Sequence, residues 1–155
     1  MILLFHSKTG LIDLSGNSVS TVWEEGEWVF KRQPKYLCDN ESYALQLLKD
    51  AGIVPHYERL GDELIRMEKL ERGSYISDAG KLWDEVKRVL FILKKYGIRH
   101  GDITAPHVFV NDGSIKIIDW AESRMWDDPR LDKRREGDEY WLNRTITELL
   151  KGESR

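Results

Sequence analysis

Two short stretches of sequence decide the fold: residues 100–110 read HGDITAPHVFV, and residues 117–120 read IIDW. Between them, an Asp-Gly pair separates two short apolar runs, which is a strong signal for a β-hairpin. A hairpin of this length brings its ends back together, so Asp102 and Asp119 are expected to approach one another. Two carboxylates beside an imidazole suit a site that binds a divalent metal and handles protons.

Short runs rich in β-branched and aromatic residues dominate the first half of the chain. Because Gly-bearing turns separate these runs, they predict strands, and the first four are expected to form a small antiparallel meander. The following segment has helical periodicity and predicts a helix that Asn40 caps and Gly52 stops. The predicted strands are residues 1–6, 11–14, 18–23, 27–31, 56–60 and 63–70.

Helical periodicity dominates the second half of the chain. Apolar residues at three- and four-residue steps predict a long helix with one buried face, which Ser77 or Asp78 caps and Gly97 stops. Beyond the hairpin, residues 127–135 are expected to form a loop or the solvated start of a helix. A final helix is predicted over residues 138–150.

This order of elements predicts an α+β fold of two lobes around one site. Residues 1–70 would form an N-lobe with an antiparallel sheet and one helix. Residues 71–155 would form a helical C-lobe that carries the hairpin, with a single crossing between the lobes near residues 67–73. At 155 residues the chain fits a single domain.

Composition limits the class of protein and its compartment. The chain is 41% hydrophobic and 33% charged, which suits a soluble globular protein, and its net charge of −3 argues against bulk electrostatic binding of nucleic acid. Cys38 is the only cysteine, so no internal disulfide and no four-cysteine metal site can form. The apolar residues 1–5 are too few to cross a bilayer and lack a signal-peptide pattern, so the sequence predicts a cytoplasmic protein without membrane association.

The two aspartate motifs resemble those of the protein-kinase-like superfamily. Residues 100–110 look like the catalytic loop of kinases in an HGD form, and residues 117–120 look like the metal-binding DFG element in an IDW form. With Thr104, the HGD form resembles the small atypical kinase of the KEOPS tRNA-modifying complex and, more distantly, the RIO kinases. HGD together with IDW is also typical of aminoglycoside phosphotransferases. Macrolide phosphotransferases are similar too, and they have a histidine, as this chain has His107, where most kinases have Asn. The resemblance implies a minimal bilobal protein-kinase-like fold.

The resemblance also implies a role for each residue of the two motifs. Asp102 would orient or deprotonate the acceptor hydroxyl, and Asp119 would hold Mg²⁺ against the phosphates of ATP. His107 would be a second metal ligand, but Mg²⁺ accepts imidazole less readily than oxygen, which leaves room for Mn²⁺ or for a single metal. The interpretation of His107 as a histidine that only packs within the loop stays open. His100 is expected to brace the loop, and Asp138 to tie its backbone to the last helix.

The N-lobe would supply the remaining catalytic residues. Lys31 ends a strand that resembles the lysine-bearing strand of kinases, so its ammonium would contact the ATP phosphates. Glu41, near the predicted helix start, would pair with this lysine. Two other interpretations stay open: Lys31 as an edge-strand lysine that prevents aggregation, and Glu41 as an acid favoured by the helix dipole alone.

Two further segments resemble nucleotide-binding parts of kinases. Residues 16–22 take the place of the glycine-rich loop, although only its first glycine is present. Residues 67–70 match the hinge, where backbone groups would meet adenine. The candidates from these two segments are Gly16, Ser18, Thr21, Met67, Glu68 and Leu70.

Three functions follow from these expectations. The first is an ATP- and metal-dependent serine/threonine protein kinase of the atypical type, supported by Thr104 and by the short C-terminal tail. The second is a pseudokinase that binds nucleotide or a partner protein, supported by the depleted glycine loop and by His107. The third is a small-molecule phosphotransferase, although only about 35 residues follow Asp119 to enclose such an acceptor. The expected partners are ATP, Mg²⁺ or Mn²⁺, and a protein substrate or regulatory protein.

Overall fold

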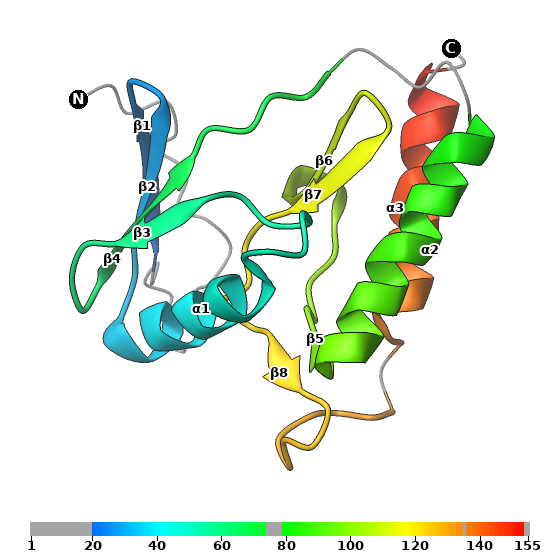
Figure 1. The fold of residues 1–155 in the computed structure, drawn as a ribbon. Helices are drawn as coiled ribbons and strands as arrows, with labels where there is room; N and C mark the ends of the chain where they lie inside the picture. The colour runs from blue at the N-terminus through cyan, green and yellow to red at the C-terminus, as the bar shows by residue number, and fades with distance from the viewer. Residues whose placement is uncertain (1–19, 74–78, 135, 154–155) are drawn as a thin grey trace.

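A four-stranded antiparallel sheet and one helix make up the N-terminal lobe (Figure 1). The computed structural model describes residues 20–73, 79–134 and 136–153, so the strands expected over residues 1–14 lie outside the described residues. The sheet order is β1-β2-β4-β3, with every pairing antiparallel as predicted. The strands are β1 (Thr21–Glu25), β2 (Trp28–Arg32), β3 (Tyr57–Arg59) and β4 (Leu64–Glu68).

Helix α1 spans Lys35–Leu48 and begins before the start that the sequence predicts. Its N-cap is Pro34, whose carbonyl accepts the amide of Cys38 at 3.0 Å. The predicted cap at Asn40 is therefore wrong, because this residue lies inside the second turn. A proline disfavours the helical conformation in the residue before it, so the helix does not extend back beyond Pro34.

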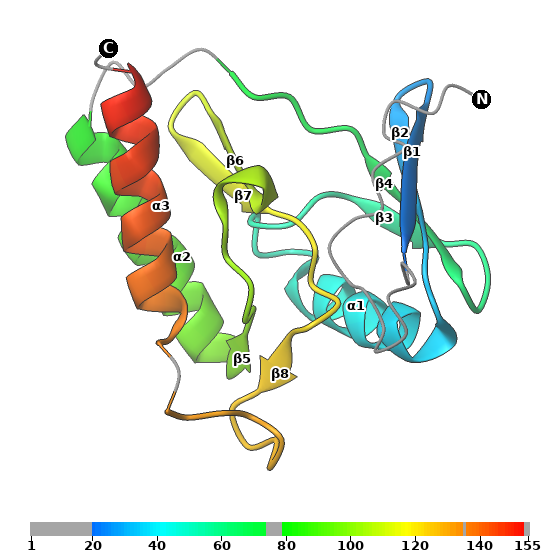
Figure 2. The same cartoon turned by 180° about the vertical axis from the view of Figure 1, so that it is seen from behind.

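Two long helices lie side by side in the C-terminal lobe, as both views show (Figures 1 and 2). Helix α2 spans Ala79–Tyr96, and helix α3 spans Asp138–Glu153, close to the predicted ranges. Residues 127–134 form turns and irregular chain, so the loop interpretation of this charged segment is confirmed over its described part. The antiparallel sheet and these helices together give the α+β, two-lobed fold that the sequence predicts.

The hairpin between the aspartate motifs consists of β6 (Val108–Asn111) and β7 (Ser114–Ile117). Asp112 and Gly113 form its turn with φ values of 51° and 77°, and positive φ at both positions is what a type I′ turn requires. A short 3-10 turn, η1 (Ala105–His107), leads into it. The sequence did not reveal the small pair β5 (Ile98–Arg99) and β8 (Arg124–Met125), because two residues are too few to show a period.

One hydrophobic cluster connects the sheet, all three helices and the hairpin. At its centre Trp120 is fully buried, and its indole Nε1 donates to the carbonyl of Ile117 at 2.9 Å. The amide of Ile117 in turn donates to the carbonyl of Ile53, which follows α1. Within the described residues, no helix is long and apolar enough to cross a membrane.

Shortening a side chain on the buried face of the sheet should lower the free energy of unfolding. Ile65 in β4 is fully buried, so Ile65→Ala is expected to cost about 2–5 kcal/mol through lost burial and the cavity left behind. Leu60 follows β3 and is 43% exposed, so Leu60→Ala should cost much less and serves as the control. Urea denaturation of the two variants measures the difference, and equal losses would contradict this placement of Ile65.

Candidate functional site

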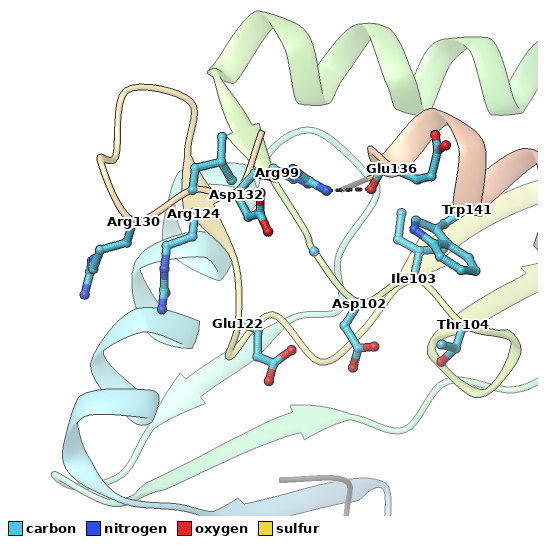
Figure 3. Close-up of a pocket in the computed structure, with 12 residues that line it drawn as sticks. Arg99, Asp102, Ile103, Thr104, Glu122, Arg124, Arg130, Asp132, Glu136 and Trp141 are labelled. Carbon is cyan, nitrogen blue, oxygen red and sulfur yellow. Dashed lines mark hydrogen bonds between the residues drawn. The ribbon is translucent and has the colours of Figure 1, made fainter. Parts of the chain in front are cut away.

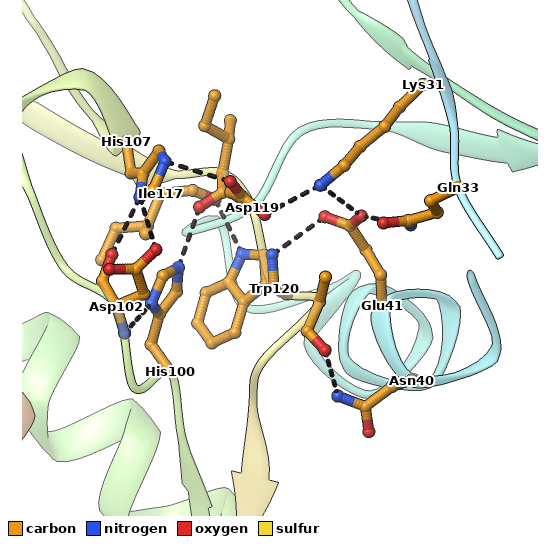
Figure 4. Close-up of polar contacts among 12 residues, drawn as sticks. Lys31, Gln33, Asn40, Glu41, His100, Asp102, His107, Ile117, Asp119 and Trp120 are labelled. Atoms are coloured by element: carbon orange, nitrogen blue, oxygen red, sulfur yellow. Dashed lines mark hydrogen bonds and ion pairs between the residues drawn. The ribbon is translucent and has the colours of Figure 1, made fainter. Parts of the chain in front are cut away.

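The β6–β7 hairpin brings the two aspartate motifs together at one point (Figure 4). The amide of Ile118 donates to the carbonyl of His107 at 2.9 Å, so the chain leaves β7 beside the start of the hairpin. Asp102, His107 and Asp119 each offer a ligand atom, and these atoms lie within 4.8 Å of one another. The approach of the two aspartates that the hairpin predicts is therefore observed.

His107 faces both aspartates with its ring nitrogens. Its Nε2 lies 3.0 Å from Asp119 Oδ2, and its Nδ1 lies 2.8 Å from the carbonyl oxygen of Asp102. Two ligands of an octahedral ion with bonds of about 2.1 Å are also about 3 Å apart, so His107 and Asp119 are spaced to share one ion. Carboxylates suit Mg²⁺ and Mn²⁺, and the imidazole suits the softer of the two, so the residues present fit such a metal.

The ammonium of Lys31 joins the sheet to both α1 and the second motif. Its Nζ lies 3.0 Å from Glu41 Oε1 and 2.8 Å from Asp119 Oδ1. Because β2 lies between β1 and β4, and only 4% of this side chain is exposed, the edge-strand interpretation of Lys31 is wrong. Glu41 lies in the second turn of α1 and not at the helix start, so the helix dipole does not explain its presence.

Glu41 uses both carboxylate oxygens inside the protein. Besides Lys31, its Oε1 accepts a hydrogen bond from Gln33 Nε2 at 2.8 Å. Its Oε2 accepts the backbone amide of Trp120 at 2.9 Å. The side chain is fully buried, where an unpaired carboxylate would be strongly unfavourable. Glu41 therefore links α1 to the residue directly after Asp119.

The surrounding charges keep Lys31 and Asp119 ionised. Burial opposes the charged ammonium, but the carboxylates of Glu41 and Asp119 outweigh it and raise the pKa of Lys31 far above its ordinary value. Burial likewise opposes the Asp119 carboxylate, but the hydrogen bond from His107 and the charge of Lys31 hold its pKa well below its ordinary value. Asp119 is therefore an anion at neutral pH, as a carboxylate metal ligand must be.

Buried polar contacts fix the loop before the hairpin. His100 Nε2 lies 2.8 Å from the carbonyl of Ile118, and its Nδ1 accepts the amide of Asp102 at 3.0 Å. The carboxylate of Asp138, the first residue of α3, accepts the amides of His100 and Gly101 at 2.7 and 3.1 Å. The bracing contacts expected of His100 and of Asp138 are confirmed.

A cleft of about 510 Å³ opens between the sheet and the hairpin. Lys31 and Asp119 both line it, so the charged group described above faces this space. The end of β4 and the linker after it form another part of the wall. The residues that the sequence assigned to a hinge, and that line the cleft, are Met67, Glu68 and Leu70.

The expected phosphate-binding loop is placed only in part. Thr21 is exposed at the start of β1 and is not part of the cleft lining, whereas Gly16 and Ser18 lie outside the described residues. The next residue, Val22, does line the cleft, together with Val29 of β2. The alternation of side chains between the two faces of a strand is the signal that identifies this pair. Val29 lies two residues from Lys31 and on the same face of β2, and Val22 pairs with Lys31 across the two strands.

Arg72 connects the linker after β4 to the hairpin. Its guanidinium lies over the ring of Phe109 at 4.2 Å. It also donates to the carbonyls of Val108 and Pro106 at 2.7 and 2.9 Å. Arg72, Phe109 and Pro106 all line the cleft. No local sequence pattern predicts this contact, because Arg72 lies more than thirty residues from the carbonyls that it binds.

A second cavity, of about 360 Å³, borders Asp102 and shares no lining residue with the cleft (Figure 3). Glu122 and Arg124 from the chain after the second motif form part of its wall. Trp141 of α3 forms another part and is 38% exposed. In Figure 3 the carboxylates of Asp102 and Glu122 point to the same side. Asp102 thus lies close to Asp119 at the first cleft and also lines a separate open cavity.

Comparison with known proteins identifies the fold. No protein-family profile matches the chain, and no curated protein does. Among solved structures, the chain is similar to that of a Rio2 kinase–ADP/Mg²⁺–phosphoaspartate complex from Chaetomium thermophilum, with a TM-score of 0.58 and 16% identity. The match covers 83% of this chain and 49% of the other, so the chain spans about half the length of that kinase. The expected protein-kinase-like fold is thereby confirmed.

The His107–Asp119 pair should give the metal-free protein a pH-dependent stability. Burial lowers the pKa of His107, but the hydrogen bond and charge of Asp119 outweigh it, so the pKa lies above its ordinary value of about 6.5. A raised folded-state pKa stabilises the protein fully below about pH 6.5, and this contribution disappears as pH rises through the folded-state value.

The measurement is urea denaturation in chelator at pH 6, 7, 8 and 9, comparing wild type with His107→Gln. The stability advantage of wild type over the variant should be largest at pH 6 and should shrink as pH rises. A difference that stays constant across this range would show that His107 gains no proton affinity on folding.

Proposed function

We propose that the protein is an ATP- and metal-dependent phosphotransferase, acting as an atypical protein kinase on serine or threonine hydroxyls. The observation that carries the proposal is the contact of Lys31 with both Glu41 and Asp119 at the wall of the cleft, with Asp102 and His107 beside Asp119. Phosphoryl transfer needs this combination of a fixed cation, acidic metal ligands and a carboxylate that orients the acceptor. The similarity to a kinase described with ADP and Mg²⁺ supports the same conclusion.

In this proposal the nucleotide occupies the cleft. Val22 and Val29 on the sheet side, and Phe109 and Ile118 on the hairpin side, offer apolar walls suited to a flat base. Residues 67–70, at the end of β4 and just after it, would supply the polar edge of the base site. Lys31, held by its two carboxylates, contacts the phosphates without having to reorganise, which is how fixed charges stabilise a transition state.

Asp119 and His107 would hold Mg²⁺ or Mn²⁺, and the bound ion would neutralise the phosphate oxygens during transfer. Asp102 orients the acceptor hydroxyl and receives its proton. This role fits its position, because the Asp102 carboxylate also borders the second cavity, from which an acceptor side chain would approach. The two lobes would work as a single domain over residues 1–155.

Two other functions are supported by particular observations. Asp119 already contacts Lys31 and His107, so a pseudokinase that binds nucleotide without transfer would keep the same contacts. A small-molecule phosphotransferase would need to enclose its acceptor, and the 360 Å³ cavity at Asp102 is the space available for it. The long charged side chains around this cavity, among them Arg124 and Arg130, suit the open approach of a polypeptide segment better.

Substitution of the two aspartates should separate binding from transfer. With labelled ATP, Mg²⁺ or Mn²⁺ and a generic protein acceptor, Asp119→Ala should lose about 100-fold or more of the transfer rate. Asp102→Asn should lose transfer to a similar extent but keep nucleotide binding, because its carboxylate faces the acceptor and not the cleft lining. Thermal stabilisation by ATP measures binding, and Asp127→Asn, an exposed acid outside both cavities, is the control.

The same assay decides among the three functions. Label on an added aminoglycoside or macrolide would favour the small-molecule enzyme, and thermal stabilisation without transfer would favour the pseudokinase. No stabilisation by ATP with either metal would overturn the proposal. Since the Rio2 structure is described as a phosphoaspartate complex, any label on the protein is also treated with hydroxylamine, which removes acyl phosphates and leaves phosphoesters.

Truncation of Trp141 should affect the acceptor and leave the nucleotide unaffected. This side chain lines the cavity at Asp102 and is absent from the cleft lining, so Trp141→Ala should raise the acceptor KM by roughly fivefold to tenfold. The affinity for ATP should not change. Phe91→Ala, which removes an exposed ring from α2 outside both cavities, is the matched control. Equal kinetics of the two variants would place the acceptor elsewhere.

A further inference from the structure

The side chain of Asn40 binds the chain that follows Asp119. Its Nδ2 donates to the carbonyl of Ala121 at 2.7 Å and to the carbonyl of Ser123 at 2.8 Å. A side-chain amide has two N–H donors, so both are committed to one short segment that is more than eighty residues away in sequence. Figure 4 shows this amide directed from α1 toward the chain that follows Asp119.

The segment that Asn40 holds begins at the candidate metal ligand. Asp119 has a φ of 64°, a left-handed conformation that residues other than glycine rarely adopt without support from their surroundings. The next amide, that of Trp120, is bound by Glu41. Two successive residues of α1 therefore hold the chain at three points directly after the strained residue: the Trp120 amide and the carbonyls of Ala121 and Ser123.

These contacts fix a segment that lies between Asp119 and the loop that carries Asp102. Ala121 and Ser123 are buried, whereas Glu122 between them is exposed and lines the cavity at Asp102. The carbonyl of Glu122 lies so close to Gly101 that a Cβ added there would be 3.3 Å from it. The path after Asp119 thus packs directly against the loop that carries Asp102.

We propose that Asn40 is a positioning residue: its amide holds the chain after Asp119 in the path that aims the Asp119 carboxylate at the metal shared with His107. The inference rests on the proposed function, since it concerns that metal site. Asn40 does not line the cleft and does not belong to the Asp102–His107–Asp119 group, so it would act only through the Asp119 segment. Lys31 still attracts Asp119 without this contact, but the ammonium alone does not set the direction of the second carboxylate oxygen.

The test separates metal-dependent from metal-independent nucleotide binding. A non-hydrolysable ATP analogue is titrated calorimetrically into the protein in EDTA, and then in Mg²⁺ and in Mn²⁺. The metal-dependent gain in affinity is the readout, because a residue with a merely structural role would change both conditions alike. For Asn40→Ala we expect the affinity in EDTA to stay within about twofold and the metal-dependent gain to fall about tenfold.

Three further variants distinguish loss of the Asn40 contact from a general loss of stability. Asn40→Ser retains one donor and should recover part of the gain, whereas Asn40→Asp places an acceptor against two carbonyls and should lose at least as much as alanine. Asp39→Ala removes the neighbouring ion pairs with Lys35 and Arg59 without touching the Asp119 segment, and should keep the full gain. Its thermal unfolding reports the general cost of weakening α1.

The outcomes are distinct. A full metal-dependent gain in Asn40→Ala, or an equal loss in EDTA and in metal, would overturn the positioning role while the proposed function stands. A wild-type protein that binds the analogue no better with metal than in EDTA would overturn the proposed function, and this inference with it. Loss in Asn40→Ala and Asn40→Asp, with recovery in Asn40→Ser, supports the inference.

Discussion

A buried ammonium between two carboxylates is the interaction on which the rest of the structure depends. Lys31 comes from the sheet, Glu41 from α1 and Asp119 from the chain after the hairpin, so three separate parts of the fold meet at this group. Removal of Lys31 would leave two buried carboxylates without their cation, at a cost of about 3–5 kcal/mol. The sheet, the helix and the hairpin are therefore held in one arrangement by the same three side chains.

This constraint also explains how several charged groups can lie close together in a partly buried site. Carboxylates that lie close together repel one another, and burial makes each charge less favourable. Lys31 offsets this cost at Asp119 from one side, and His107 does so from the other. The result is an anion beside an apolar cleft, while Asp102 lines a different cavity. The proposed transfer would need two such spaces, one for each substrate.

Several features of this site could be predicted because their causes are local in sequence. The Asp112-Gly113 turn specifies the hairpin through its backbone conformation, and the hairpin brings Asp102 and Asp119 together. The start of α1 also has a local cause: Pro34 ends the helix at its N-terminus, although Asn40 is the residue whose side chain is typical of a cap. Two-residue strands such as β5 escaped detection because they have no period to detect.

By itself the sequence determined the two-lobed α+β order of elements, the hairpin and the pair of aspartates at its ends. Each depends on turn chemistry or on periodicity within a few residues. Only the tertiary structure decided that Lys31 is an interior residue, that Glu41 reaches the amide of Trp120, and that Asn40 binds carbonyls rather than capping a helix. The physical reason is that a side chain's hydrogen bonds are chosen by whichever groups packing places beside it, and here those groups lie about eighty residues away.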